Sequence, residues 1–226
     1  MRIVFDPRPR RALTVLLIAT AVLTAFSLCG VYLKHVKGDP MFYRFVPVFD
    51  LDREGNIPNW FSTLLFAASA ALLWAIASAR AAAGDRNHRL WRALAVGFVL
   101  LSIDDAAAIH ESYVNDLRDI FHAGGVFYFA WVIPALILLA IVAPVLIKLW
   151  LSLQARTRAV LAAAAVLVVG GAVGMEMIEG GYVDVHGYKT LTYSLLANLE
   201  ETLELVGQVL LVYGLLLIVR DEPERA

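Results

Sequence analysis

The chain has 226 residues, of which 60% are hydrophobic and 17% charged, and its formal net charge at pH 7 is −1. Soluble globular domains average about 45–50% apolar and about 25% charged residues, so this composition favours an integral membrane protein over a soluble domain. The near-zero net charge gives no reason to expect a nucleic-acid partner.

Six stretches are apolar and long enough to cross a bilayer as a helix, which takes about 20 residues. They are expected at residues 12–33, 59–79, 91–113, 127–147, 159–180 and 199–219. The third, fifth and sixth contain acidic residues, and they qualify only if the interior of the protein tolerates these groups. The sequence therefore predicts an all-α, polytopic integral membrane protein whose residues 1–226 form a single domain, a bundle of six transmembrane helices.

The distribution of Lys and Arg predicts the orientation of this bundle. Thirteen of them, from Arg2 to Arg225, lie before span 1, after span 6, or in the connections between spans 2 and 3 and between spans 4 and 5. The other connections hold six. Basic residues accumulate on the cytoplasmic side of a membrane. Both termini are therefore expected in the cytoplasm, and the chain is expected to be a multi-pass protein of the inner (plasma) membrane, with the lipid bilayer as its surroundings.

The first outer connection, residues 34–58, is rich in Pro, Gly, acids and aromatic residues. Tyr43 and Trp60, at or beside it, suit the aromatic belt of a membrane interface. The segment is either a cap over the outer end of the bundle or an ordinary loop, and an ordinary loop is the simpler expectation. His122 and His186 lie in other outer connections, from which either one could fold over a site at that end.

Ionisable residues are sorted unevenly among the six spans. The interiors of spans 1, 2 and 4 hold none, whereas spans 3, 5 and 6 hold Asp104, Asp105, His110, Glu111, Glu176, Glu179, Glu200, Glu201 and Glu204. At 1.5 Å per helical residue, Asp104 lies about 18 Å, Glu176 about 27 Å and Glu204 about 24 Å from the cytoplasmic ends of their helices. Three spans therefore place carboxyl groups in the outer half of the membrane.

Helical spacing predicts that these acids converge. Residues three, four or seven apart share a helix face, which joins Asp104 to Glu111 and Glu176 to Glu179. The same spacing in span 6 joins Glu201, Glu204 and Gln208. Glycines that permit close helix packing in lipid follow the same spans: Gly170, Gly171, Gly174, Gly207 and Gly214. A simpler interpretation remains for Glu200 and Glu201, because acids are also stabilised at a helix N-terminus.

Several carboxylates in a medium of low dielectric constant cannot all ionise without a counter-charge. A bound metal cation, protons or a water-filled vestibule would each resolve this. Oxygen ligands with one imidazole suit a divalent ion such as Mn, Mg, Ca or Fe. Zinc is disfavoured, because one cysteine and scattered histidines form no zinc motif. The predicted metal ligands are Asp104, Glu111, Glu176, Glu179, Glu201 and Glu204.

Three functions are compatible with such a site. The first is a metal-dependent membrane enzyme that acts on a lipid-like or envelope substrate, with His110 or Asp105 as the catalytic base. The second is a small cation- or proton-coupled transporter, although the two halves of the chain show no matching repeat. The third is a structural or assembly subunit whose acids meet basic residues of a partner. The sequence identifies neither the substrate nor the metal, and it leaves a homo-oligomer open.

Overall fold

The computed structural model describes residues 8–221, and every regular element within them is a helix, as predicted. The predicted basic residues Arg2 and Arg225 lie outside this range. The long helices are α1 (Pro9–His35), α3 (Ile57–Ala82), α4 (His88–Ala107), α7 (Val132–Leu151), α8 (Ala155–Val169), α9 (Glu176–His186) and α10 (Leu191–Asp221). A π-helical segment, η3 (Gly170–Met175), joins α8 to α9 without a break.

Within residues 8–221, five helices are long and apolar enough to cross a membrane: α1, α3, α7, the continuous unit of residues 155–186, and α10. This agrees with the predicted class of helical membrane protein. The third predicted span, now α4, is not among the five. Its 20 residues include Arg89, Arg92, Asp104 and Asp105, which lower its mean hydropathy.

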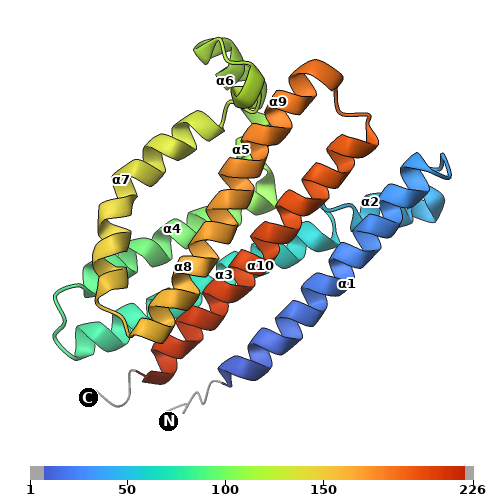
Figure 1. Cartoon of the computed structure of the whole chain (residues 1–226). Coiled ribbons are helices and arrows are strands. Elements are labelled where there is room, and N and C mark those ends of the chain that lie inside the picture. The colour runs from blue at the N-terminus through green and yellow to red at the C-terminus, as the bar shows by residue number, and fades with distance from the viewer. Residues whose placement is uncertain (1–7, 222–226) are drawn as a thin grey trace.

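Helix α10 lies at the centre of the bundle, where it packs against α1, α3, α8 and α9 (Figure 1). In its most apolar stretch 61% of the residues are buried, against 11–44% in the other four candidate spans. Helices α3 and α4 form a close pair, and α7 stands at the edge beside α8 and η3. The first residue of α1 and the last of α10 lie at the same end of the bundle (Figure 1). We call this the basic end and the opposite end, where α6 and α9 finish, the acidic end.

The predicted third span was wrong at its outer boundary, because the helix does not continue from residue 91 to residue 113. Helix α4 ends at Ala107, and Ala108 takes left-handed backbone angles (φ 49°, ψ 43°). Two short helices follow, α5 (Ile109–Ser112) and α6 (Val114–Phe121), and then the turn η2 (Gly125–Phe127). Asp104 and Glu111 therefore do not share the face of one continuous helix. The break is stabilised by Asp104, whose Oδ1 accepts the backbone N–H of His110 at 3.1 Å.

The other boundaries differ less from the predictions. The fourth span, predicted at 127–147, begins five residues later, because residues 125–127 form η2. The sixth was predicted at 199–219, but α10 begins at Leu191. Glu200 and Glu201 therefore lie in the interior of a long helix, and its N-terminus does not explain them.

The first outer connection is folded against the bundle. It contains the turn η1 (Phe42–Arg44) and the short helix α2 (Phe45–Phe49), whose Val46 packs on Gly30 of α1. The backbone N–H of Leu51 donates to Oγ of Ser27, a side chain that is 1% exposed, at 3.0 Å. Asn56 caps α3 by accepting the N–H of Asn59, and it also donates to the carbonyl of Asp50. These bonds hold residues 50–56 over the acidic end.

The bond between Ser27 and Leu51 gives a test of this attachment. Replacing Ser27→Ala should lower the free energy of unfolding by about 1–3 kcal/mol, because a buried N–H loses its acceptor. Ser78→Ala is the matched control, since Ser78 is exposed and bonds only a carbonyl of its own helix. Thermal unfolding of the detergent-solubilised protein would measure both variants. Equal stability of the two would show that Ser27 does not hold the connection in place.

Candidate metal site

Three side chains from two segments meet at the acidic end. Glu54 comes from the connection before α3, and His110 and Glu111 come from α5. Each offers one ligand atom, and these three atoms lie within 4.8 Å of one another. Glu54 and His110 are half-buried and Glu111 is exposed. We call these three residues the outer triad. Its composition of two carboxylates and one imidazole suits Mn²⁺ or Fe²⁺.

His110 is held in place by its neighbours on two sides. Its Nδ1 lies 2.8 Å from Oδ2 of Asp104, and its ring lies 5.0 Å from the ring of Trp131 at the start of α7. When Nδ1 carries the proton of the bond to Asp104, Nε2 presents its lone pair away from that carboxylate. Histidines that bind metal ions are commonly oriented by a carboxylate in this way.

Glu54 has an unusual charge environment for a residue in a connection. Burial raises the pKa of its carboxyl to about 7, and the negative charges of Glu111 and Asp105 add to this shift. Its Oε2 is buried and has no hydrogen-bond partner within the described residues 8–221. A cation placed among the three ligand atoms would satisfy this oxygen and offset the repulsion between Glu54 and Glu111.

Asp105 is already bound to α3. Its Oδ1 accepts from Ser62 at 3.1 Å and its Oδ2 accepts from Thr63. Ser62 in turn accepts from the side-chain amide of Gln208 on α10 at 3.0 Å. The Oε1 of Gln208, whose side chain is 1% exposed, has no partner. Asp105 therefore lies in a polar network that links α3, α4 and α10.

A second set of carboxyl groups lies between α9 and α10. Glu200, which is 6% exposed, interacts electrostatically with both Glu176 and Glu179. Glu176 also accepts the indole N–H of Trp131 at 3.0 Å. Glu179 is 2% exposed, and among residues 8–221 its Oε1 has no hydrogen-bond partner. We call Glu176, Glu179, Glu200 and Glu204 the inner group.

Glu204 and Glu201 extend the acids toward the centre of the bundle. Glu204 packs against Gly171 of η3, where a Cβ atom would lie 2.6 Å from its Cγ. The charges that act on Glu204 include those of Glu176, Glu179 and Asp105. Those that act on Glu201 include Glu204, Asp52 and Glu54. The acids of α4, α9, α10 and the first outer connection therefore form one electrostatically coupled cluster.

The predicted site residues separate into distinct places in this cluster. His110 and Glu111 belong to the outer triad, Asp104 lies behind His110, and Glu176, Glu179 and Glu204 belong to the inner group. Their roles as ligands or bases stay predictions. Sequence reasoning missed Glu54, which comes from a connection with no helical period, and gave no ligand role to Glu200. His186 stacks on Tyr182 and lies outside the outer triad, as does His122.

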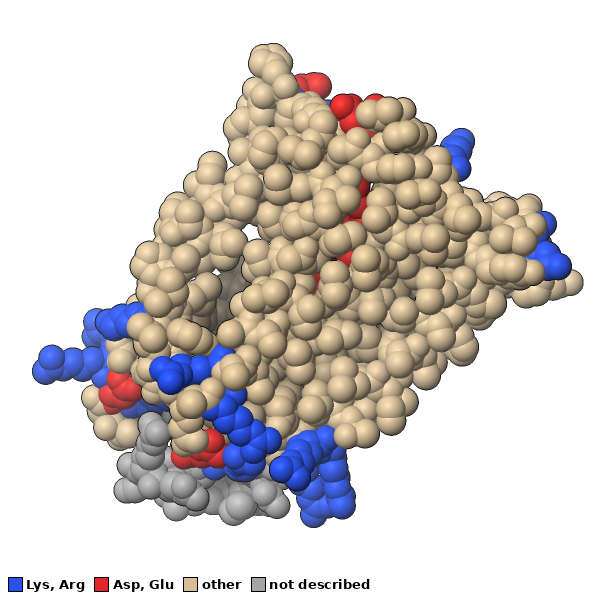
Figure 2. Space-filling view, in the orientation of Figure 1, with Lys and Arg blue, Asp and Glu red and all other residues tan. Residues whose placement is uncertain are grey.

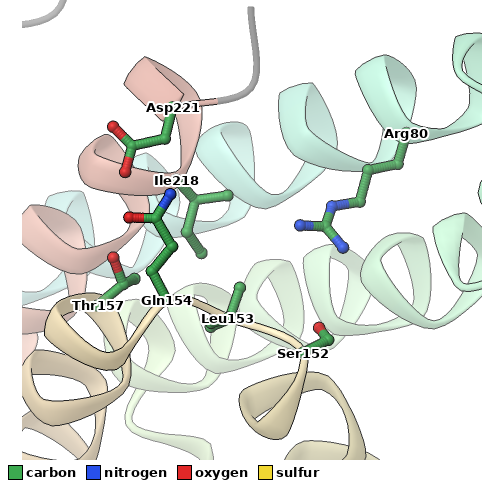
Figure 3. Close-up of a pocket in the computed structure, with 7 residues that line it drawn as sticks. All are labelled: Arg80, Ser152, Leu153, Gln154, Thr157, Ile218 and Asp221. Atoms are coloured by element: carbon green, nitrogen blue, oxygen red, sulfur yellow. The ribbon is translucent and has the colours of Figure 1, made fainter. Parts of the chain in front are cut away.

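The surface view agrees with this division of charge. Figure 2 shows most Lys and Arg atoms at the basic end, with smaller groups at the right-hand side. Acidic atoms appear at the top and in a narrow line within the upper half, and two further groups lie among the basic atoms below. A cavity at the basic end has a volume of only about 20 Å³ (Figure 3). It is lined by Arg80, Ser152, Leu153, Gln154, Thr157, Ile218 and Asp221. A space of this size holds about one water molecule, so it offers no room for a substrate.

A hollow with a volume of about 370 Å³ lies at the acidic end, and this volume is within the range of small-molecule sites. Glu54 lines it, together with Arg44 and Arg53. Glu54 therefore belongs both to this hollow and to the outer triad.

Comparison with known proteins places the chain in a family by sequence. No curated protein and no solved structure matches it. A family model matches residues 14–219, which includes the long helices, apart from the start of α1 and the end of α10, and both sets of acids. The chain therefore belongs to the family described as a domain of unknown function, DUF8692.

Proposed function

We propose that this protein is a membrane enzyme that uses a divalent cation bound by the outer triad. The observation that carries the proposal is the convergence of ligand atoms from Glu54, His110 and Glu111 within 4.8 Å. Carboxylate and imidazole ligands favour Mn²⁺ or Fe²⁺ over Ca²⁺ and Mg²⁺, which prefer oxygen alone. In this proposal Nε2 of His110 is a ligand, and Asp104 orients the imidazole.

The proposed chemistry is activation of water for attack on a lipid-like or envelope substrate. Three protein ligands leave coordination positions for water and substrate, and a divalent cation lowers the pKa of bound water. Glu111 is the most exposed of the three residues. It is therefore the residue best placed to leave the cation and act as a base. The adjoining hollow of about 370 Å³ supplies space for a substrate group beside the cation.

Cation- or proton-coupled transport is the second candidate, and the inner group favours it. Glu176, Glu179 and Glu200 interact electrostatically between two apolar helices, and ionisable groups in such positions commonly mark the path of an ion. Cation flux through proteoliposomes separates this candidate from the enzyme. A path to the basic end would pass Gln208 and then the apolar core around Leu215, which weakens this reading.

The membrane topology is part of the proposal. Helix α4 is the sixth crossing, paired with α3 and carrying its acids toward α10. The basic end faces the cytoplasm, in keeping with the excess of Lys and Arg there, so both termini are cytoplasmic and the outer triad faces the opposite side. We propose the inner (plasma) membrane as the location of this multi-pass protein.

Cation binding tests the proposal directly. Purified protein should bind Mn²⁺, and Glu54→Gln should weaken the binding about tenfold, because the amide keeps an oxygen but loses the charge. Asp119→Asn is the control, since it removes an exposed acid of α6. Isothermal titration calorimetry with Mn²⁺ would measure both. The proposal fails if Glu54→Gln binds Mn²⁺ as tightly as the control.

A further inference from the structure

The hollow beside the outer triad has a positive lining. It is bounded by Arg44, Pro47, Val48, Arg53, Glu54, Gly55, Asn56 and Ile57. Within residues 8–221 the guanidinium groups of Arg44 and Arg53 make no hydrogen bond or ion pair. Two unpaired guanidinium groups at one hollow are a suitable arrangement for an anion with several oxygen atoms.

The backbone fixes one of these arginines in a restrained conformation. Tyr43 and Arg44 both have positive φ, at 49° and 67°, which non-glycine residues rarely adopt. The bonds of Asn56 to the carbonyls of Pro47 and Asp50 hold the opposite wall of the hollow. Strained backbone persists only where surrounding contacts maintain it, and it is concentrated at binding sites.

Exposed apolar side chains beside Arg44 indicate that the hollow lies near the membrane surface. Met41 is 55%, Phe42 40% and Tyr43 95% exposed, in the three positions that precede it. Exposed aromatic residues next to basic ones are typical of segments that sit at the level of lipid headgroups. Figures 1 and 2 show that this region, around α2, projects from the bundle and carries Lys and Arg atoms at its tip. A lipid headgroup is therefore the nearest source of an anion.

We propose that Arg44 and Arg53 bind the phosphate group of a lipid headgroup beside the cation of the outer triad. This inference rests on the proposed function in one respect, because Glu54 lines the same hollow and would repel an anion. A cation bound to Glu54 removes that repulsion and supplies a further positive charge. The substrate class is then a phosphate-bearing lipid, held by two arginines on one side and the cation on the other.

Binding of a short-chain lipid tests this assignment. The probe is dihexanoyl phosphatidate, titrated into the full-length protein in detergent with and without Mn²⁺. We expect Arg44→Gln and Arg53→Gln each to weaken binding at least tenfold, and Mn²⁺ to strengthen it in the wild-type protein. Arg86→Gln is the matched control, an exposed arginine at the basic end. Elution volume and melting temperature check that the variants are folded.

The outcomes separate the two proposals. If phosphatidate binding is unchanged in both arginine variants, the anion site is overturned, whatever the result for Mn²⁺. If both variants weaken binding but Mn²⁺ neither binds nor affects it, the anion site stands and the outer triad fails as a cation site. Inorganic phosphate forms a second arm: equal binding of phosphate and phosphatidate would overturn the assignment to a lipid, and preference for phosphatidate would support it.

Discussion

Mn²⁺ affinity should rise roughly 100-fold between pH 5 and pH 7.5, because a cation must displace the proton of Glu54. With the pKa of this carboxyl raised to about 7, the protonated form predominates below that pH. Each unit of pH below 7 then lowers the apparent affinity about tenfold, and the affinity levels off above 7. Calorimetric titrations at four pH values would define the curve.

Two comparisons make this expectation specific to Glu54. In Glu54→Gln the pH dependence should become shallower, because no proton leaves that position. Without cation, the stability of the wild-type protein should change in the opposite sense. The folded state binds the Glu54 proton more tightly than the unfolded state, so stability falls as pH rises from about 4.5 to 7. Flat Mn²⁺ affinity over this range would contradict the assignment of Glu54 as a ligand.

Gly207→Ala should lower the free energy of unfolding by about 1–3 kcal/mol, because it forces α8 and α10 apart. A Cβ at this position would lie 2.7 Å from Cγ2 and 2.8 Å from the backbone nitrogen of Val168. The side chain could rotate away, but the backbone atom can move only with its helix. The loss should therefore appear as a lower melting temperature in detergent.

Gly170→Ala is the matched control for this change. A Cβ there meets no described atom within 4 Å, although Gly170 directly follows α8 as the first residue of η3. Alanine also favours helix over glycine by up to about 1 kcal/mol, so this variant should be as stable as the wild type or more so. A melting temperature for Gly207→Ala equal to that of Gly170→Ala would show that the close contact is not maintained.

The sequence predicts the parts of the fold that a bilayer requires, which are the long apolar helices. A span must satisfy its own backbone hydrogen bonds, so long apolar runs become helices, and α1, α3, α7 and α10 could be located in this way. Glycine contacts were predictable only in part: Gly171, Gly207 and Gly214 meet neighbours, whereas Gly170 and Gly174 do not.

Two features of the candidate site could not be predicted from local sequence. Ala108 breaks α4 although alanine is the strongest helix former, because the break depends on Asp104 bonding His110. Glu54 lies 56 positions before His110, in a connection whose sequence has no periodic pattern from which its fold could be predicted. Its place follows from tertiary contacts of its own segment, such as the bond from Leu51 to Ser27.

The π-helical segment η3 changes the rotational register between α8 and α9, which form one continuous helix with it. Its wider turn adds one residue relative to regular α-helical geometry, which rotates everything after it by about 100° around the axis. This rotation separates two faces of the helix. One face of α8 meets α10 at Gly207, and a different face of α9 carries Glu176 and Glu179. The α8 part of this helix therefore packs closely on α10, while the acids of the α9 part lie toward Glu200. In evolutionary terms, a single inserted or deleted codon in this segment would rotate the acids relative to their partners while leaving the packing of α8 intact.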